Sequence, residues 1–328
     1  MNLQNIRVVQ VNYGTSSLVI EGLHALQLER ENFPKLSVML IDNFSLDDSV
    51  KKLQSTIIEN SWCDWVSLHI SNINGGFAYG NNLGIKLSAL EADKPEIFWL
   101  LNPDTRVIAG ATQALVARLQ ENPNSIVGSR LEDDDGQAQC STFRFPSIAT
   151  EVSSGFKLAV VDRLLSKHLC CHDPSRPDWM AGASLMFTAA TQQRSGEMDE
   201  SYFLYYEEVD YLLHANSLGI HCLFVPESRV VHRVGASTGI SDERKQQLRR
   251  PRYWFESRRL YFVKNHGRAY LLWADMLWSL GYTSWIIRKW LTKSEELDRR
   301  PPYFLSDFLR YSDLNPKKWI SEICERYG

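Results

Sequence analysis

The chain has 328 residues, of which 44% are hydrophobic and 23% are charged, so it can bury a large core and is not disordered as a whole. Its formal net charge of -3 excludes the strongly basic character of a general nucleic-acid binder, and we expect no nucleic-acid partner. The N-terminus lacks a basic segment followed by a long apolar run, which predicts no secretory signal and a cytoplasmic protein.

The first half of the chain alternates short β-branched runs with longer amphipathic segments. This pattern is typical of an α/β fold, a Rossmann-like parallel sheet with helices on both faces. A helix is expected at residues 78–90, and Ser45 is placed to cap another that starts near Leu46. Strands are expected at residues 6–11, 36–41, 65–70, 97–101 and 125–129.

From residue 132 the alternation loosens. The sequence EDDDGQAQ at 132–139 predicts a tight turn between strands, and a variable stretch continues to Asp178. Regular patterns then return: WMAGASLMF predicts one buried strand, EEVDYLLHANSLG a helix ended by Gly219, and IHCLFVP and SRVVH two further strands.

The six cysteines include no C-x-x-C pair, which favours reduced thiols. The only cluster is HLCCH at 168–172. Because its ligands lack zinc spacing, a plain loop is favoured over a metal site there.

Polar loops follow four of the predicted strands. They are Asn12-Tyr13-Gly14, Asp42-Asn43, NINGGFAYGNNLG at 72–84, and Asn102-Pro103-Asp104. Because the carboxyl ends of parallel strands meet at one edge of a sheet, these loops would share one crevice. Acidic and amide side chains there can bind a base or ribose, and Gly75 and Gly76 would let the backbone approach a diphosphate. Each loop alone is equally well explained as a turn.

The glycine spacing argues against two familiar nucleotide-binding classes. Gly76, Gly80 and Gly84 follow G-x-x-x-G-x-x-x-G, whereas a dehydrogenase fingerprint reads G-x-G-x-x-G. A P-loop sequence is also absent.

Seven motifs occur in order: VQVNYG, LIDNFSLDDS, NINGGFAYGNNLG, LLNPDT, WMAGASLMF, MDESYFLYYEEVDY and VVHRVGAS. Together they resemble the inverting family 2 glycosyltransferases, and among these the rhamnosyltransferase-like branch. The resemblance covers residues 6–238. It implies a GT-A type fold, a UDP- or dTDP-sugar donor, Mg²⁺ or Mn²⁺, and a single displacement with inversion at the anomeric carbon. It therefore predicts a catalytic domain at residues 1–238 and a helical extension at 239–328.

The resemblance also assigns donor and metal residues. Asp104 would hold the metal with His232, although relatives often have an acid where this chain has Asn102. Oxygen ligands completed by phosphate and water suit magnesium or manganese, and imidazole favours manganese. The alternative for His232 is an ordinary histidine that ends a strand. Residues expected to contact the donor are Asn12, Tyr13, Asp42, Asn74, Gly76, Phe77 and Asn102.

The acceptor's base is expected at an acidic pair that opens a helix. The resemblance assigns it to Glu208, where relatives usually carry Asp, with Asp210 orienting the site and Asp199-Glu200 meeting the acceptor. Acids are favoured at helix N-termini in any case, and the same helix dipole would keep Glu208 ionised, as a base must be. We hypothesise that Glu208 deprotonates the acceptor while Asp104 and its metal stabilise the leaving diphosphate.

The C-terminal segment is basic and rich in tryptophan. Residues 241–268 hold nine Arg or Lys against three acids, and AYLLWADMLWSLGYTSWII follows. A stretch that is apolar nearly all round lies in protein or in lipid. It predicts peripheral contact with the inner face of the cell membrane or, equally, helices packed on the catalytic domain or in a homodimer. A spanning helix is disfavoured because Asp275 falls within it.

The expected function is transfer of a sugar, with rhamnose favoured by resemblance, to a glycan or polyprenyl-diphosphate-linked acceptor in cell-surface polysaccharide synthesis. The departures at Asn102 and Glu208 leave open a non-catalytic nucleotide-sugar-binding subunit. A sugar-1-phosphate nucleotidyltransferase shares the sheet pattern, yet the acidic pair and His232 favour acceptor activation.

Overall fold

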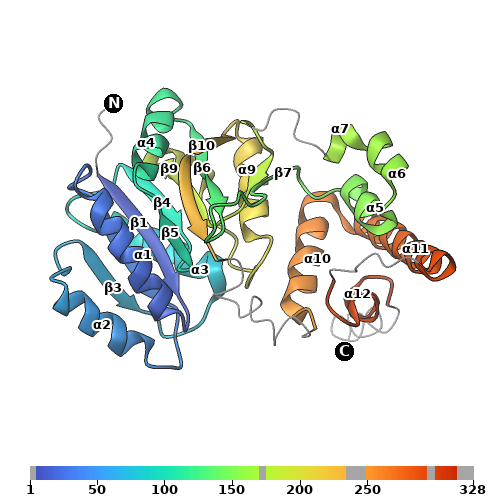
Figure 1. Cartoon of the computed structure of the whole chain (residues 1–328), viewed down its shortest axis with the longest axis horizontal. Helices are drawn as coiled ribbons and strands as arrows, with labels where there is room; N and C mark the ends of the chain where they lie inside the picture. Colours follow the sequence, from blue (N-terminus) through green and yellow to red (C-terminus); the bar gives the residue numbers. More distant parts are fainter. Residues whose placement is uncertain (1–4, 170–174, 234–248, 294–299, 316–328) are drawn as a thin grey trace, which may run out of the picture. The chain divides into compact units, whose positions relative to one another are not determined.

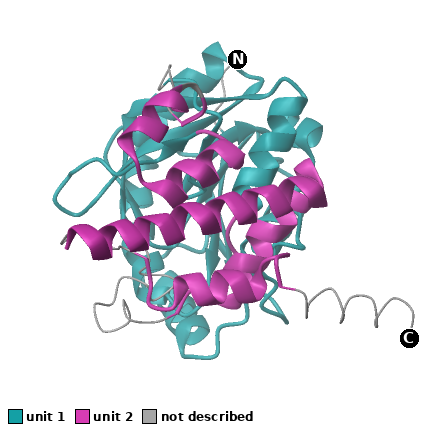
Figure 2. Cartoon of the chain, turned by 90° about the vertical axis from the view of Figure 1, so that its right-hand side faces the viewer, with its two compact units in different colours: residues 1–143, 173–203, 207–243 teal, residues 144–172, 204–206, 244–328 magenta. Residues whose placement is uncertain are grey.

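The computed structural model describes residues 5–169, 175–233, 249–293 and 300–315. The chain divides into two compact units (Figure 2): unit 1 comprises residues 1–143, 173–203 and 207–243, and unit 2 comprises residues 144–172, 204–206 and 244–328. The strands are β1 (Ile6–Asn12), β2 (Ser37–Asp42), β3 (Val66–Ile70), β4 (Ile97–Leu101), β5 (Thr105–Val107), β6 (Ser125–Glu132), β7 (Thr142–Phe143), β8 (Trp179–Met180), β9 (Ser184–Thr188) and β10 (His221–His232).

Helices account for most of the other described residues (Figure 1). They are α1 (Ser16–Glu29), α2 (Ser49–Glu59), α3 (Gly76–Ala89), α4 (Ala111–Glu121), α5 (Ile148–Phe156), α6 (Ala159–Leu164), α7 (Ser166–Leu169), α8 (Ala189–Ser195), α9 (Glu207–Ser217), α10 (Arg252–His266), α11 (Arg268–Thr292) and α12 (Phe304–Tyr311).

The core of unit 1 is an eight-stranded sheet in the order β3-β2-β1-β4-β9-β6-β10-β5. Strands β1 to β4 pair in parallel, as do β6 and β10. The predicted parallel pairing is thus present, and two antiparallel strands join it: β9 runs antiparallel between β4 and β6, and β5 runs antiparallel to β10. The five strands expected in the first half are confirmed to within one residue at their starts.

Helices cover both faces of this sheet. Alternate residues of β1 point to opposite faces: Val8 joins the cluster with α1, α2 and α4, whereas Val9 and Val11 face α3. Glycines on one side of α3 explain the contact between α3 and β1. A Cβ at Gly80 would lie 2.6 Å from Val11, and one at Gly84 2.4 Å from Val9, so only glycine lets α3 approach β1 this closely.

Three local predictions in unit 1 are wrong. Helix α2 starts at Ser49 and Ser45 does not cap it, because the Ser45 hydroxyl is bonded to Asp42. WMAGASLMF forms two strands, β8 and β9, joined by a turn. The two strands expected after Gly219 are one strand, β10, with an irregularity between Val225 and Arg229.

Unit 2 is a helical assembly of α5, α6, α7, α10, α11 and α12. Helix α11 packs closely against α5, since a Cβ at Gly155 would lie 2.8 Å from the Trp278 carbonyl oxygen, and one at Gly281 2.6 Å from the Phe156 ring. Its aromatic core comprises Phe255, Trp278, Tyr282, Trp285, Phe304 and Phe308. The predicted helical extension is thus confirmed in its described part. Within the described residues, no helix is both long and apolar enough to cross a bilayer.

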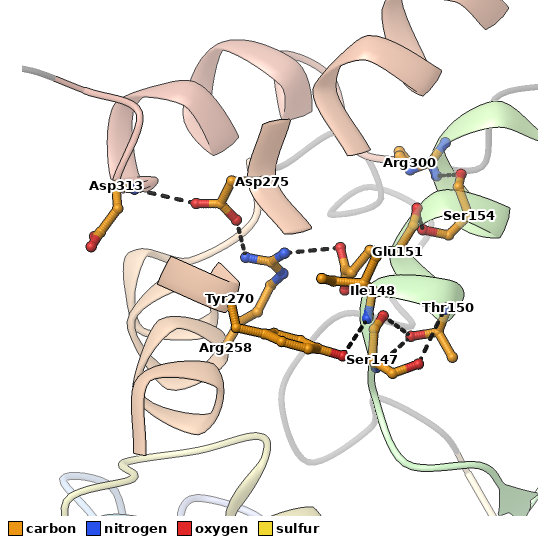
Figure 3. A network of polar contacts seen from close by, with 10 residues as sticks. All are labelled: Ser147, Ile148, Thr150, Glu151, Ser154, Arg258, Tyr270, Asp275, Arg300 and Asp313. Carbon is orange, nitrogen blue, oxygen red and sulfur yellow. Dashed lines mark hydrogen bonds and ion pairs between the residues drawn. The ribbon is translucent and has the colours of Figure 1, made fainter. Parts of the chain in front are cut away.

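Charged side chains pair inside unit 2, and Arg258, Asp275 and Asp313 among them are buried (Figure 3). The Arg258 guanidinium donates to Asp275 at 2.7 Å and to Glu151 at 2.9 Å. Asp313 binds both Arg259 and Arg268 through its carboxylate, and its backbone N–H donates to Asp275. We call these six residues the ion-pair network. Removing one partner of such a buried pair leaves an uncompensated charge, which makes the network a determinant of this unit's fold.

Candidate functional site

The ends of β1 and β2 are joined by side-chain hydrogen bonds. Asn12 donates to the Asp42 carboxylate at 2.7 Å, and Ser45 donates to it from its hydroxyl at 2.7 Å and its backbone N–H at 2.9 Å. Asn12 and Asp42 are wholly buried, whereas Tyr13 beside them is 44% exposed. The two buried side chains therefore organise this loop, and their contact with a nucleoside stays a prediction.

The loop before α3 is tied to the loop after β2. Asn43 donates to the Asn74 side chain and to the Gly76 carbonyl, both at 3.0 Å. Gly76 has a φ of +86°, and a Cβ there would lie 2.0 Å from the Phe203 carbonyl oxygen. Phe77 donates its backbone N–H to that same oxygen at 3.0 Å. The Phe203 carbonyl therefore by itself requires glycine at 76, and the approach of a diphosphate to this loop stays a prediction.

Asp104 and His232 come together at the end of β10. His232 pairs with Thr105 in the β10–β5 ladder, and the Arg233 backbone N–H donates to the Asp104 carbonyl. The Asp104 Oδ1 and His232 Nε2 atoms lie 3.5 Å apart, and both side chains are largely buried. Backbone pairing thus holds a carboxylate and an imidazole side by side. Among the described residues, no group of three His, Cys, Asp or Glu side chains forms a metal site.

Asn102 lies two residues before Asp104, in the turn after β4. Its backbone N–H donates to the Ala183 carbonyl at 2.9 Å, which fixes the turn against the segment between β8 and β9. The buried Asn102 Oδ1 has no hydrogen-bond partner in the described part of the chain. A buried acceptor without a partner costs free energy, so it marks a position where a ligand can donate.

The acidic pair opens α9, and Glu208 lies beside the same segment. A Cβ at Gly182 would lie 3.3 Å from the Glu208 Cβ and 3.7 Å from the Phe77 ring. Burial raises the pKa of Glu208, and hydrogen bonds from the backbone N–H groups of Glu208 and Val209 oppose this only in part. Burial and the neighbouring Glu208 raise the pKa of Glu207 well above its ordinary value. Burial thus acts on the pKa of Glu208 in the opposite direction to the helix N-terminus, which was expected to keep it ionised.

Asp210 is placed differently from Glu208. It is buried and accepts a hydrogen bond of 3.2 Å from the Tyr202 hydroxyl. This contact connects α9 to the segment that carries the Phe203 carbonyl. Glu200, expected near the acceptor, accepts from Asn82 at 2.9 Å.

These contacts define two groups among the predicted residues. In the first group, Gly182 lies beside Glu208 and Phe77, and the next residue, Ala183, accepts a hydrogen bond from Asn102. Asp104, which is paired with His232, follows Asn102 two residues later in the chain. Asn12, Asp42 and Asn74 lie in the neighbouring loop network and are not shown to contact the first group. Sequence reasoning included Asn43 in a polar loop without a specific role, and missed Gly182 and Phe203. The small residues of MAGAS were the available signal for Gly182, whereas a backbone carbonyl such as that of Phe203 leaves no signal.

Two residues directly before the acidic pair adopt unusual backbone conformations. Tyr205 and Tyr206 both have a φ of +70°, which is rare for residues with a side chain and costs about 1–3 kcal/mol each. Both side chains pack on aromatic residues of α10: Tyr205 stacks on Tyr253, and Tyr206 contacts Trp254. Such strain clusters at functional sites.

Two curated relatives have sequence similarity to the chain, and no protein-family model matches it. It is 24% identical over 203 residues to the low-salt glycan biosynthesis hexosyltransferase Agl10 of Haloferax volcanii, a match that covers 57% of the chain and 63% of that relative, less than two thirds of its length. It is 27% identical over 248 residues to the N-acetylglucosaminyl-diphospho-decaprenol L-rhamnosyltransferase of Mycobacterium tuberculosis, covering 71% of the chain and 77% of that relative.

Two solved structures have the same fold. GalNAc-T7 with UDP, GalNAc and Mn²⁺ matches with a TM-score of 0.53 and 18% identity, over 70% of this chain and 44% of that one. The mannosyltransferase PcManGT of Pyrobaculum calidifontis, in complex with GDP-Man and Mn²⁺, matches with a TM-score of 0.57 and 12% identity, over 90% of this chain and 76% of that one. These likenesses confirm the predicted fold, a GT-A type sheet with helices on both faces and C-terminal helices.

Proposed function

We propose that the chain is a glycosyltransferase of glycan biosynthesis, which moves a hexose from a nucleoside-diphosphate sugar to a glycan or polyprenyl-diphosphate-linked acceptor. The GT-A fold and the hexosyl- and rhamnosyltransferase relatives support this class of reaction. The observation that carries it is Glu208: a partly buried carboxylate at a helix start, whose Oε2 has no hydrogen-bond partner among the described residues. The motifs favour UDP or dTDP as the carrier, and the mycobacterial relative favours rhamnose.

In this proposal Glu208 acts as the general base. Its carboxylate takes the proton of the acceptor hydroxyl, the oxygen forms a bond to the anomeric carbon, and the bond from that carbon to the diphosphate breaks with inversion. A pKa raised by burial makes Glu208 a stronger base than an exposed glutamate, provided that it is ionised. Gly182 lies beside Glu208, and the Phe77 ring lies beside Gly182, so these two residues limit the size of the acceptor group that can reach the carboxylate.

A carboxylate and an imidazole held side by side suit a divalent cation. Asp104 and His232 would hold Mg²⁺ or Mn²⁺, with phosphate oxygens and water as further ligands, and imidazole favours manganese. A cation bound there stabilises the negative charge of the departing diphosphate. The Asn102 amide oxygen, which has no partner in the described chain, can accept from a donor hydroxyl or from bound water.

A thermal-shift panel of UDP-, dTDP- and GDP-sugars, each with and without Mn²⁺, tests this function. One donor should raise the melting temperature in a Mn²⁺-dependent way, because a ligand that binds only the folded state stabilises it by mass action. Asp104→Asn should remove the Mn²⁺-dependent part. Asp64→Asn, a change at an exposed carboxylate, is the matched control. No shift with any donor would contradict the proposal, and binding without transfer would favour a non-catalytic subunit.

A further inference from the structure

Helix α11 has an exposed face without charge. Its members are strongly accessible: Trp290 is 77% and Leu291 65% exposed. At 100° per residue these positions fall on one side of the helix, opposite the buried Asp275, Trp278, Tyr282 and Trp285. We call this side the outer face, and its exposed members are Trp273, Leu280, Ile286, Ile287, Trp290 and Leu291.

The charged residues of α11 all have partners within unit 2. Asp275 binds Arg258, and Arg268 binds Asp313. Arg288 donates to the Phe156 carbonyl, and Lys289 lies over the Trp285 ring. The outer face is therefore mainly apolar from Trp273 to Leu291, with Thr283 as an exposed polar member. The helix has 25 residues and is about 38 Å long. A surface this large and this apolar marks an interaction site.

The opposite side of α11 is packed against other residues of unit 2. Asp275 is wholly buried and ion-paired with Arg258, which is 4% exposed, and the aromatic core of unit 2 packs around it. Helix α11 cannot be surrounded by lipid on all sides, because lipid would then replace the residues of unit 2 that contact Asp275. Whatever covers the outer face must approach from one side only.

The charge of unit 2 indicates the kind of partner. Its sequence contains 22 Lys and Arg against 11 Asp and Glu, a net charge of +11. A second copy of the unit would bring like charges together, whereas an anionic lipid surface attracts them at about 1 kcal/mol per basic residue near the surface. Lys293 is exposed just beyond the end of α11. Tryptophans near both ends of the face are also typical of the membrane interface.

The basic residues predicted to recruit a membrane contribute less than their sequence indicates. Arg258 and Arg259 are held in the ion-pair network, and Arg252 binds Glu256. Arg244 and Lys245 lie outside the described residues. A count of charges in the sequence does not reveal this ion pairing.

We propose that the outer face of α11 lies in the plane of an anionic membrane surface, with its apolar side chains among the acyl chains. This goes beyond the proposed function and does not depend on it, since membrane binding needs no sugar donor. For an acceptor carried on a polyprenyl diphosphate, such docking holds the protein in the leaflet that contains the acceptor.

Flotation of the purified full-length chain with vesicles tests the proposal. The wild type should float with vesicles of phosphatidylcholine and about one third phosphatidylglycerol, and much less with phosphatidylcholine alone. Leu280→Glu and Ile287→Glu should each lower the partition coefficient about ten- to a hundredfold, since each removes a large apolar side chain from the acyl region. Leu90→Glu, a change at an exposed leucine of unit 1, is the matched control and should not alter flotation.

Further measurements distinguish the other occupants of this face. Both α11 variants should keep the wild-type melting temperature, because the altered side chains are exposed. Equal flotation of wild type and variants, or no flotation of the wild type, would overturn the proposal. A wild type that is dimeric without lipid and becomes monomeric in the variants would assign the face to a second copy instead.

Discussion

The two units contain buried carboxylates in opposite electrostatic settings. Unit 1 carries 14 Lys and Arg against 28 Asp and Glu, a net charge of -14, whereas unit 2 has a net charge of +11. In unit 2, Arg258 binds both Glu151 and Asp275 directly. In unit 1, one oxygen each of Glu207 and Glu208 has no hydrogen-bond partner in the described chain.

This difference separates carboxylates that hold the fold from those available to a ligand. Burial raises the pKa of Asp275, but the nearby Arg258 opposes this and satisfies the charge. Burial also raises the pKa of Glu208, and only backbone amides oppose it. Buried carboxylates with a shifted pKa and no ionic partner are candidates for catalysis, because a substrate or metal can supply the missing interaction.

The largest expected effect on stability is at the centre of the ion-pair network. Arg258→Met leaves Glu151 and Asp275 buried without their cation, and should lower the free energy of unfolding by about 3–5 kcal/mol. Arg252→Met, on the same helix but at an exposed ion pair, should cost less than about 1 kcal/mol. Urea denaturation measures both. A small loss at Arg258 would show that the network does not determine this fold.

A smaller effect is expected where the chain crowds itself in unit 1. Gly76 and Gly110 share a φ of +86°, but only at Gly76 would a Cβ meet another atom. Gly110→Ala should cost about 1–2 kcal/mol for the left-handed conformation alone. Gly76→Ala should cost about 1–3 kcal/mol more, because the Phe203 carbonyl must move. Equal losses in urea denaturation would mean that the contact with Phe203 is not rigid.

The smallest expected effect is a dependence on pH at Glu207. Its pKa is raised on folding, so its contribution to stability is complete below the unfolded pKa, about 4.3, and is lost as the pH rises through the folded pKa. Glu207→Gln should therefore melt about 2–4 °C higher than the wild type at pH 8, and show little difference near pH 4. Glu59→Gln, at an exposed position, is the control. The same difference at both pH values would contradict this origin.

Much of the fold was predictable because unit 1 strands are buried on both faces. Strand β4, IFWLL, appears in the sequence as a continuous apolar run, and β1, IRVVQVN, as a mainly β-branched one, which indicates their limits. The antiparallel β9 was not predictable, since strand direction follows from tertiary pairing and not from residue pattern. Residues 144–169 also gave no sign that they belong with α10 and α11, because their contacts are with chain more than a hundred residues away.

The candidate site was predictable in residue type and less so in geometry. The loops with Asn and Asp were found from their place after strands. The buried Asp42 carboxylate accepts hydrogen bonds from Ser45, a residue for which the sequence predicted a role as a helix cap. Motif matching identified Glu208, whereas the net direction of its pKa depended on burial that only the folded chain reveals.

The central claim is that Glu208 is the base of a sugar transfer, and turnover of Glu208→Gln tests it most directly. The donor found by thermal shift would be paired with a polyprenyl-diphosphate-linked sugar, the acceptor class of the proposal. The account predicts that transfer falls about 10²- to 10⁴-fold while the donor-induced melting shift is unchanged. Asp64→Asn should keep full turnover. Undiminished transfer by Glu208→Gln would contradict the account.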